Sequence, residues 1–152
     1  RIGKKMIHTG DTGTQWGISK EELMERISES AKATADHFGD HIAYINVLRN
    51  MSVSCDCEGT AAQPVVTPNI GILASTDILA ADQASVDLVY ALPEKYRHDL
   101  VERMETRHGL RQLSYMKELG MGCDRYVILD MDHGDTPITL AEAVKNVKPF
   151  KA

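Results

Sequence analysis

The spacing of apolar residues predicts helices along much of the chain. After Ser19 and Glu22, which have the spacing of a capping box, apolar side chains recur at helical intervals up to Gly39. We therefore expect a helix over about 20–38. Further helices are expected from near Asp77 to Tyr90, from Glu94 to His108, over about 111–119, and from Thr139 to about Val147, where Glu142 completes a second capping-box spacing.

Three short segments rich in β-branched and apolar residues predict strands. They cover residues 42–48, 70–75 and 126–129. The first two are nearly continuous in apolar character, which is typical of strands buried on both faces. Because helices are expected between strands, the sequence predicts an α/β fold with a parallel or mixed sheet of three or more strands and helices packed on it.

Length and the first residue indicate one domain taken from a longer protein. A chain of 152 residues can bury one core, so we expect residues 1–152 to form a single α/β domain. The chain begins with Arg1 rather than methionine, and we expect it to be the C-terminal part of a longer protein. Residues 50–69 lack periodicity and contain Pro64 and Pro68, which predicts a long loop with a functional role.

Charge and composition exclude several classes of partner. There are 17 Lys and Arg against 22 Asp and Glu, a formal net charge of −5, and no basic run exceeds Lys4-Lys5, which argues against nucleic acid. No apolar stretch approaches the roughly 20 residues that cross a bilayer, so no membrane partner is expected. Three cysteines are too few for a disulfide scaffold in a chain of this size, which favours a reducing cytoplasm.

Cys55 and Cys57 are the most informative residues for chemistry. They stand one residue apart in the long loop and have Asp56 and Glu58 as neighbours. Side chains two positions apart can point the same way, so both thiolates could ligate one metal ion or one iron-sulfur cluster. They would fill half of a four-ligand shell. Redox chemistry between the two thiols, or their burial as small apolar side chains, stays open.

Other ligands would have to come from elsewhere in the chain. His8 lies in a glycine-bounded segment near the expected domain edge, where a histidine is more often solvated than a ligand. Cys123 lies at a helix-to-strand turn and is an additional candidate. Asp82 lies within the apolar part of a predicted helix, where a buried carboxylate needs a partner or a proton, so it is a candidate acid or base. The predicted metal ligands are Cys55, Cys57 and His8.

Several motifs occur together in an order that characterises one family. They are Tyr44-Ile45-Asn46-Val47-Leu48, Cys55-Asp56-Cys57, residues 69–75 and 81–88, and the later His108-Gly109 and Glu118-Leu119-Gly120-Met121-Gly122. With this set the chain resembles the family named domain of unknown function 362, also described as iron-sulfur centre proteins. The resemblance covers roughly residues 40–130 closely and the ends loosely.

The resemblance implies an α/β domain in an intracellular prokaryotic protein, with Cys55, Cys57 and His8 as ligands. Many members of the family carry an inserted pair of ferredoxin-type cysteine motifs before the segment that matches Tyr44, and this chain lacks that insert. The resemblance also implies a preceding N-terminal half that shares the site. The partners implied are that half of the parent protein and a redox partner.

Three functions fit these residues. The first is an iron-sulfur or metal-binding protein that serves electron transfer or redox support, with an iron-sulfur cluster or a single zinc or iron ion as its cofactor. The second is a metal-assisted enzyme that uses the same loop, with Asp82 as an acid or base. The third is a structural zinc or docking domain without catalysis.

Overall fold

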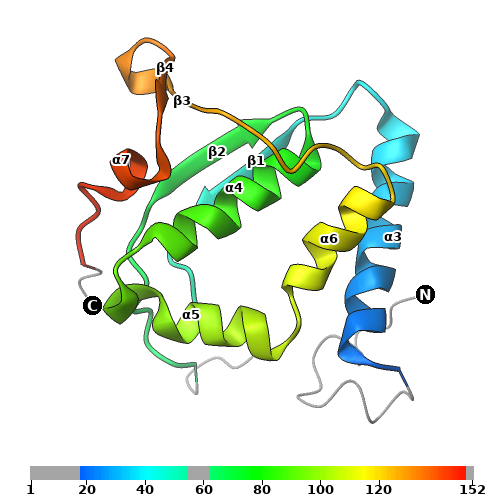
Figure 1. Cartoon of the computed structure of the whole chain (residues 1–152), viewed down its shortest axis with the longest axis horizontal. Helices are drawn as coiled ribbons and strands as arrows, with labels where there is room; N and C mark the ends of the chain where they lie inside the picture. The colour runs from blue at the N-terminus through cyan, green and yellow to red at the C-terminus, as the bar shows by residue number, and fades with distance from the viewer. Residues whose placement is uncertain (1–17, 55–61, 150–152) are drawn as a thin grey trace.

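The computed structural model describes residues 18–54 and 62–149, and Figure 1 shows how the elements of these two ranges are arranged. The helices are α3 (Lys20–Phe38), α4 (Ile78–Ala91), α5 (Glu94–Thr106), α6 (Leu110–Glu118) and α7 (Leu140–Val144). The strands are β1 (Tyr44–Leu48), β2 (Gly71–Ser75), β3 (Ile128–Asp130) and β4 (Thr136–Ile138), and a 3-10 turn, η2 (Met131–His133), joins the last two.

The helix predictions are confirmed, and local capping explains their ends. The Glu22 amide donates to the Ser19 side chain at 3.0 Å, and α3 ends at Gly39, whose φ of 54° suits a residue without a Cβ. At α7, Thr139 and Glu142 form a reciprocal capping box, in which each side chain bonds to the backbone of the other residue. This helix ends earlier than expected, at Val144.

The predicted parallel or mixed sheet of three or more strands is wrong. Within the described residues, β1 pairs with β2 alone and β3 with β4 alone, and both pairs are antiparallel. The long connection after Leu48 returns the chain so that Leu48 faces Gly71, as in a wide hairpin. The third predicted strand begins only at Ile128 and pairs with β4, a strand that the sequence did not predict because Pro137 stands at its centre.

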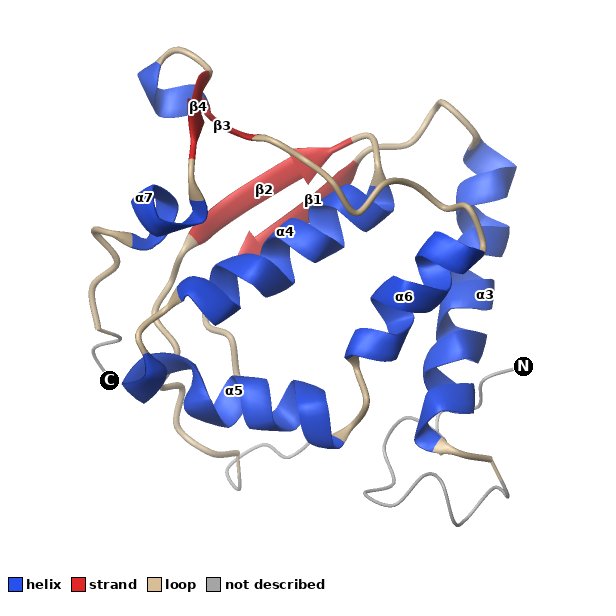
Figure 2. Ribbon diagram, viewed as in Figure 1, coloured by secondary structure: helices blue, strands red, loops and turns tan. Residues whose placement is uncertain are grey.

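Helix α4 covers one face of the β1–β2 pair. Figure 2 shows α4 running along the two strands, and its Leu88 forms a buried cluster with Leu48, Leu92 and Val144. Burial of each such side chain stabilises the fold by roughly 1.5–3 kcal/mol. No described residue covers the opposite face of the pair, and Ile45 and Ile72 on that face are 66% and 69% exposed.

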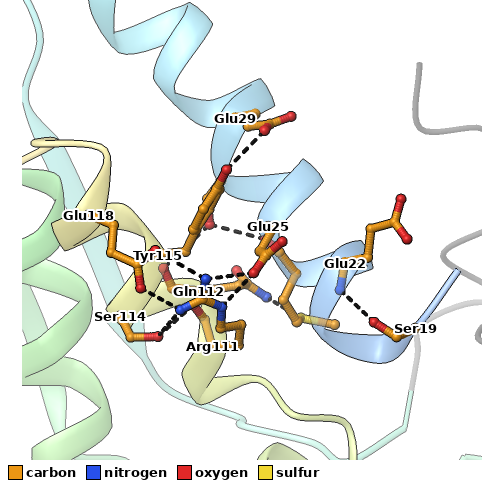
Figure 3. A network of polar contacts seen from close by, with 11 residues as sticks. Ser19, Glu22, Glu25, Glu29, Arg111, Gln112, Ser114, Tyr115 and Glu118 are labelled. Atoms are coloured by element: carbon orange, nitrogen blue, oxygen red, sulfur yellow. Dashed lines mark hydrogen bonds and ion pairs between the residues drawn. The ribbon is translucent and has the colours of Figure 1, made fainter.

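Polar contacts attach α3 to α6. Figure 3 shows Arg111 of α6 between two carboxylates: its Nε donates to Glu25 of α3 at 2.7 Å and its Nη1 to Glu118 at 2.6 Å. The guanidinium lowers the pKa of Glu118 below its usual value. Beside it, Tyr115 donates its phenolic hydrogen to Glu29 of α3 at 3.1 Å. Since charged pairs near the surface are screened by salt, this junction depends on ionic conditions more than the α4 core does.

No helix in residues 18–54 and 62–149 is both long enough and apolar enough to cross a membrane.

Candidate functional site

Hydrogen bonds close the base of the loop between β1 and β2. The Asn50 amide donates to the Asn69 side chain at 2.8 Å, which joins the two ends of the loop next to the strands. Further out, the Gln63 amide donates to Ser54 Oγ at 2.9 Å, and the Ser54 amide donates to Ser52 Oγ at 3.0 Å. The chain on either side of residues 55–61 is therefore tied together at Ser54.

Three predicted ligands lie outside the described residues. Cys55 and Cys57 fall within residues 55–61, and His8 falls within residues 1–17. Their role as metal ligands stays a prediction. The described chain stops at Ser54 and resumes at residue 62, and the hydrogen bond from the Gln63 amide to Ser54 Oγ joins the two sides of this gap.

A cleft of about 520 Å³ lies where the base of the loop meets α5. The loop contributes Ser54 and Gln63 to its wall, and α5 contributes Asp99 and Glu102. Carboxylate oxygens are ligands for zinc and iron, so this cleft offers donors beside the point where the cysteine segment begins. Arg103 also lines the cleft and supplies a positive charge near the two carboxylates.

One of these carboxylates already has a partner. Asp99 lies 3.0 Å from the Nδ1 atom of His98, and this hydrogen bond raises the pKa of His98 above its usual value. A protonated imidazole does not coordinate a metal. Within residues 18–54 and 62–149, no group of three or more His, Cys, Asp and Glu side chains could hold a metal ion.

Asp82 holds α4 against β1. The Asn46 side chain donates to Asp82 Oδ1 at 2.8 Å and to Ser85 Oγ at 2.9 Å, and the Ser85 hydroxyl donates to the Ala81 carbonyl at 2.7 Å. Asp82 is partly buried and lines neither the loop cleft nor the larger groove beside β2. The described contacts account for this carboxylate as a link between helix and strand.

Cys123 lies at the other end of the sheet from the loop. Its thiol is free and exposed, and its amide donates to Asp77 Oδ2 at 2.8 Å. Asp77 stands two residues after Ser75, the last residue of β2, whereas the loop enters β2 at its first residue, Gly71. The five residues of β2 at about 3.3 Å each therefore separate Cys123 from the base of the loop. The structure does not bring these two candidates together.

No pattern in the sequence marks the residues that close the loop and line its cleft. Ser54 and Gln63 are ordinary loop residues, and their bond spans a separation of nine positions. Asp99 and Glu102 lie on the exposed face of a helix, where acidic residues are common. Only the folded chain brings them beside Ser54 and Gln63.

Comparison with known proteins identifies a family. The model of the family described as "Domain of unknown function (DUF362)" matches residues 1–87, which include the Tyr44–Leu48 and Cys55-Asp56-Cys57 motifs. The motifs between His108 and Gly122 that contributed to the resemblance lie beyond the matched range. Neither the search of curated proteins nor the search of solved structures gives a match. Since the family model covers more than half of the sequence, the chain belongs to the domain of unknown function 362 family.

Proposed function

We propose that this chain binds a single zinc or iron ion, or an iron-sulfur cluster, through the thiolates of Cys55 and Cys57. Its role is electron transfer or redox support. The observation that carries the proposal is the pair of thiols, one residue apart, on a segment whose ends are joined by the bond between Gln63 and Ser54. Closing a loop at its base reduces the entropy lost when its side chains converge on one ligand.

The chain's own donors fit a mixed coordination shell. Asp99 and Glu102 line the cleft next to the base of the loop and supply oxygen donors, and His8 is a further candidate. Because these 152 residues contain only three cysteines, a cluster with four cysteine ligands would need at least one thiolate from outside them. A single ion with two thiolates and two oxygen or nitrogen ligands needs no such help. When bound, either group would supply a redox or Lewis-acid centre.

The proposed partners follow from the same site. A cluster with four cysteine ligands would take its remaining ligands from the N-terminal half of the parent protein, and a redox role requires a redox partner. We place this function in the cytoplasm, where thiols stay reduced and free to ligate.

Metal analysis of anaerobically purified protein tests the proposal. We expect stoichiometric iron or zinc in the unaltered chain, with acid-labile sulfide if the iron belongs to a cluster. Cys55→Ser with Cys57→Ser should remove at least nine-tenths of the bound metal and leave the helix content unchanged, because the described helices all lie outside residues 55–61. The matched control is Cys123→Ser, which makes the same chemical change at an exposed thiol and should keep the metal.

Two results would contradict the metal-binding function. One is full metal content in the double serine variant, and the other is absence of metal from protein reconstituted with ferrous iron and sulfide or with zinc. If zinc is bound and its removal unfolds the chain, the site is structural, which favours the docking alternative. An enzymatic role for Asp82 would gain support only if Asp82→Asn abolished a measured turnover while the fold was retained.

A further inference from the structure

A groove of about 1150 Å³ lies between β2 and the segment that contains β3. Two runs of consecutive residues, 70–75 and 126–132, form its walls. Side chains of a strand alternate between its faces, so consecutive residues line one groove only where the edge of the strand faces that groove. The first wall is therefore the edge of β2, and the second contains the three residues of β3 between a loop and the turn η2.

Each of these two strands has one edge without a strand partner in the described part of the chain. β2 pairs with β1 on one side only, and β3 pairs with β4 on one side only. An edge strand presents a row of unpaired N–H and C=O groups, to which an extended peptide can add by β-augmentation. The five residues of β2, at about 3.3 Å each, give an edge about 17 Å long.

The floor of the groove consists of small side chains on α4. Ala80, Ala81 and Ala84 face it, and the last two are 3% and 5% exposed. These two side chains are therefore already covered within the fold, and the open surface of the groove lies on its walls. Large apolar side chains of the walls are exposed to water: Val127 at 70%, Leu129 at 51% and Met131 at 79%, with Ile72 at 69% on the face of β2 that points away from α4.

The charge on the rim is of one sign. The ionisable carboxylates that line the groove are Asp130, Asp132, Asp135 and Glu142, and no Lys, Arg or His of the described residues lines it. Asp130 pairs with His133 at 2.8 Å, and Glu142 is engaged in the cap of α7. Asp132 and Asp135 have no hydrogen bond or ion pair from their carboxylates within the described residues, so both are free to meet a cation.

From this geometry we infer that the groove binds an extended segment of a partner polypeptide, in strand conformation along the free edge of β2. The segment carries β-branched or other apolar side chains at alternate positions, which cover the exposed apolar side chains of the walls. A lysine or arginine at its end pairs with Asp132 and Asp135. The groove begins at Leu48 and Ile70 beside the loop but shares no lining residue with the loop cleft, and the inference does not depend on the proposed metal site.

Peptide binding to the full chain tests this inference. The probe is a fluorescein-labelled peptide of the sequence Lys-Thr-Val-Thr-Val-Thr-Val-Lys, and the readout is fluorescence anisotropy at low salt. We expect saturable binding, together with slower hydrogen exchange of the β2 amides and no change in the β1 amides. A peptide with proline at the central valine removes a backbone donor and should bind at least tenfold more weakly.

Charge exchange supplies the matched variants. Asp132→Lys with Asp135→Asn should lower the affinity for the lysine peptide at least tenfold. The same variant should bind a peptide with terminal glutamates in place of the lysines more tightly than the unaltered chain does. Asp40→Lys changes an exposed aspartate in the turn after α3 and should leave both affinities unchanged. The inference would be overturned if the proline peptide bound as tightly as the valine peptide, or if the charge exchange changed neither peptide's affinity. It would also be overturned by absence of saturable binding, or by a concentration-dependent dimer of the free chain that protects β2, because a second copy would then be the occupant.

Discussion

At the scale of single residues, three aspartates fix α4 to three different neighbours. Asp77 caps the helix and accepts the amide of Cys123, while Asp82 accepts the side chain of Asn46. Asp87 accepts the hydroxyl of Tyr126 at 2.5 Å, and this bond, together with the burial of the ring, raises the pKa of Tyr126 well above its usual value. Burying a carboxylate costs free energy unless it is hydrogen-bonded, so each pairing offsets the cost of its position.

Gly122 makes the Asp77 contact sterically possible, and its replacement is the first prediction at this scale. A Cβ at Gly122 would overlap the Asp77 carboxylate, and its φ of 156° is rare for residues with side chains. Gly122→Ala should therefore displace Asp77 and disrupt both the helix cap and the bond to Cys123. We expect the free energy of unfolding, measured with urea, to fall by about 1–3 kcal/mol.

Gly71 offers the matched control. A Cβ there has no heavy atom within 4 Å, so Gly71→Ala should change the free energy of unfolding by no more than about 0.5 kcal/mol. If Gly122→Ala were as stable as this control, the Asp77 contact would not constrain the turn.

At the scale of elements, the helices could be predicted from the sequence because neighbouring residues determine where they begin and end. Helix α3 could be predicted because Ser19 and Gly39 mark its ends, and the capping box at Thr139 and Glu142 marks the start of α7. Strand pairing was mispredicted because it is settled by contacts between distant segments: Leu48 faces Gly71 across the long loop. The cysteine pair of the candidate site was visible in the sequence, whereas the cleft beside it arises only when α5 packs near the loop.

The junction of α3 with α6 gives the prediction at this scale. Arg111 bonds to Glu25 and Glu118, so Arg111→Met should loosen α3 while α4 and β1 stay intact. We expect the amides of α3 to exchange roughly threefold or more faster, and the difference from the unaltered chain to shrink near 1 M salt, where the screening length is about 3 Å. Arg26→Met is the matched control, because Arg26 pairs only with Glu22 of its own helix in the described structure.

The lowered pKa of Glu118, which Arg111 binds within α6, gives that helix a pH dependence. A carboxyl group with a pKa lower in the folded state than in the unfolded state stabilises the fold above its unfolded pKa, and that contribution is lost as the pH falls through the folded value. Protection of α6 against hydrogen exchange should therefore decrease below about pH 4, starting near the pKa of an unperturbed glutamate. Identical protection in Arg111→Met and in the unaltered chain at neutral pH would refute the role of Arg111.

At the scale of the whole molecule, apolar surface is divided unequally between the two faces of the β1–β2 pair. The face toward α4 buries Leu48 and Leu88, which are 8% and 2% exposed. On the other face, Ile45 and Val47 of β1 are 66% and 55% exposed, and they lie opposite Ala74 and Ile72 of β2. A contiguous apolar face of this kind attracts other apolar groups, whereas scattered exposed residues do not.

Substitutions on the two faces should accordingly differ in their effect on the free energy of unfolding and on dye binding. Ile45→Thr with Val47→Thr keeps the β-branched shape that suits a strand and removes methyl groups that already contact water, so the free energy of unfolding should change by less than about 1 kcal/mol. Binding of the dye ANS should fall at least twofold, because the apolar face is the expected dye site. Leu88→Ala, on the buried side, should cost about 2–5 kcal/mol and raise dye binding as the core loosens. If the threonine variant lost as much stability as Leu88→Ala, with dye binding unchanged, the face occupied by Ile45 and Val47 would be part of the core rather than a free surface of this chain.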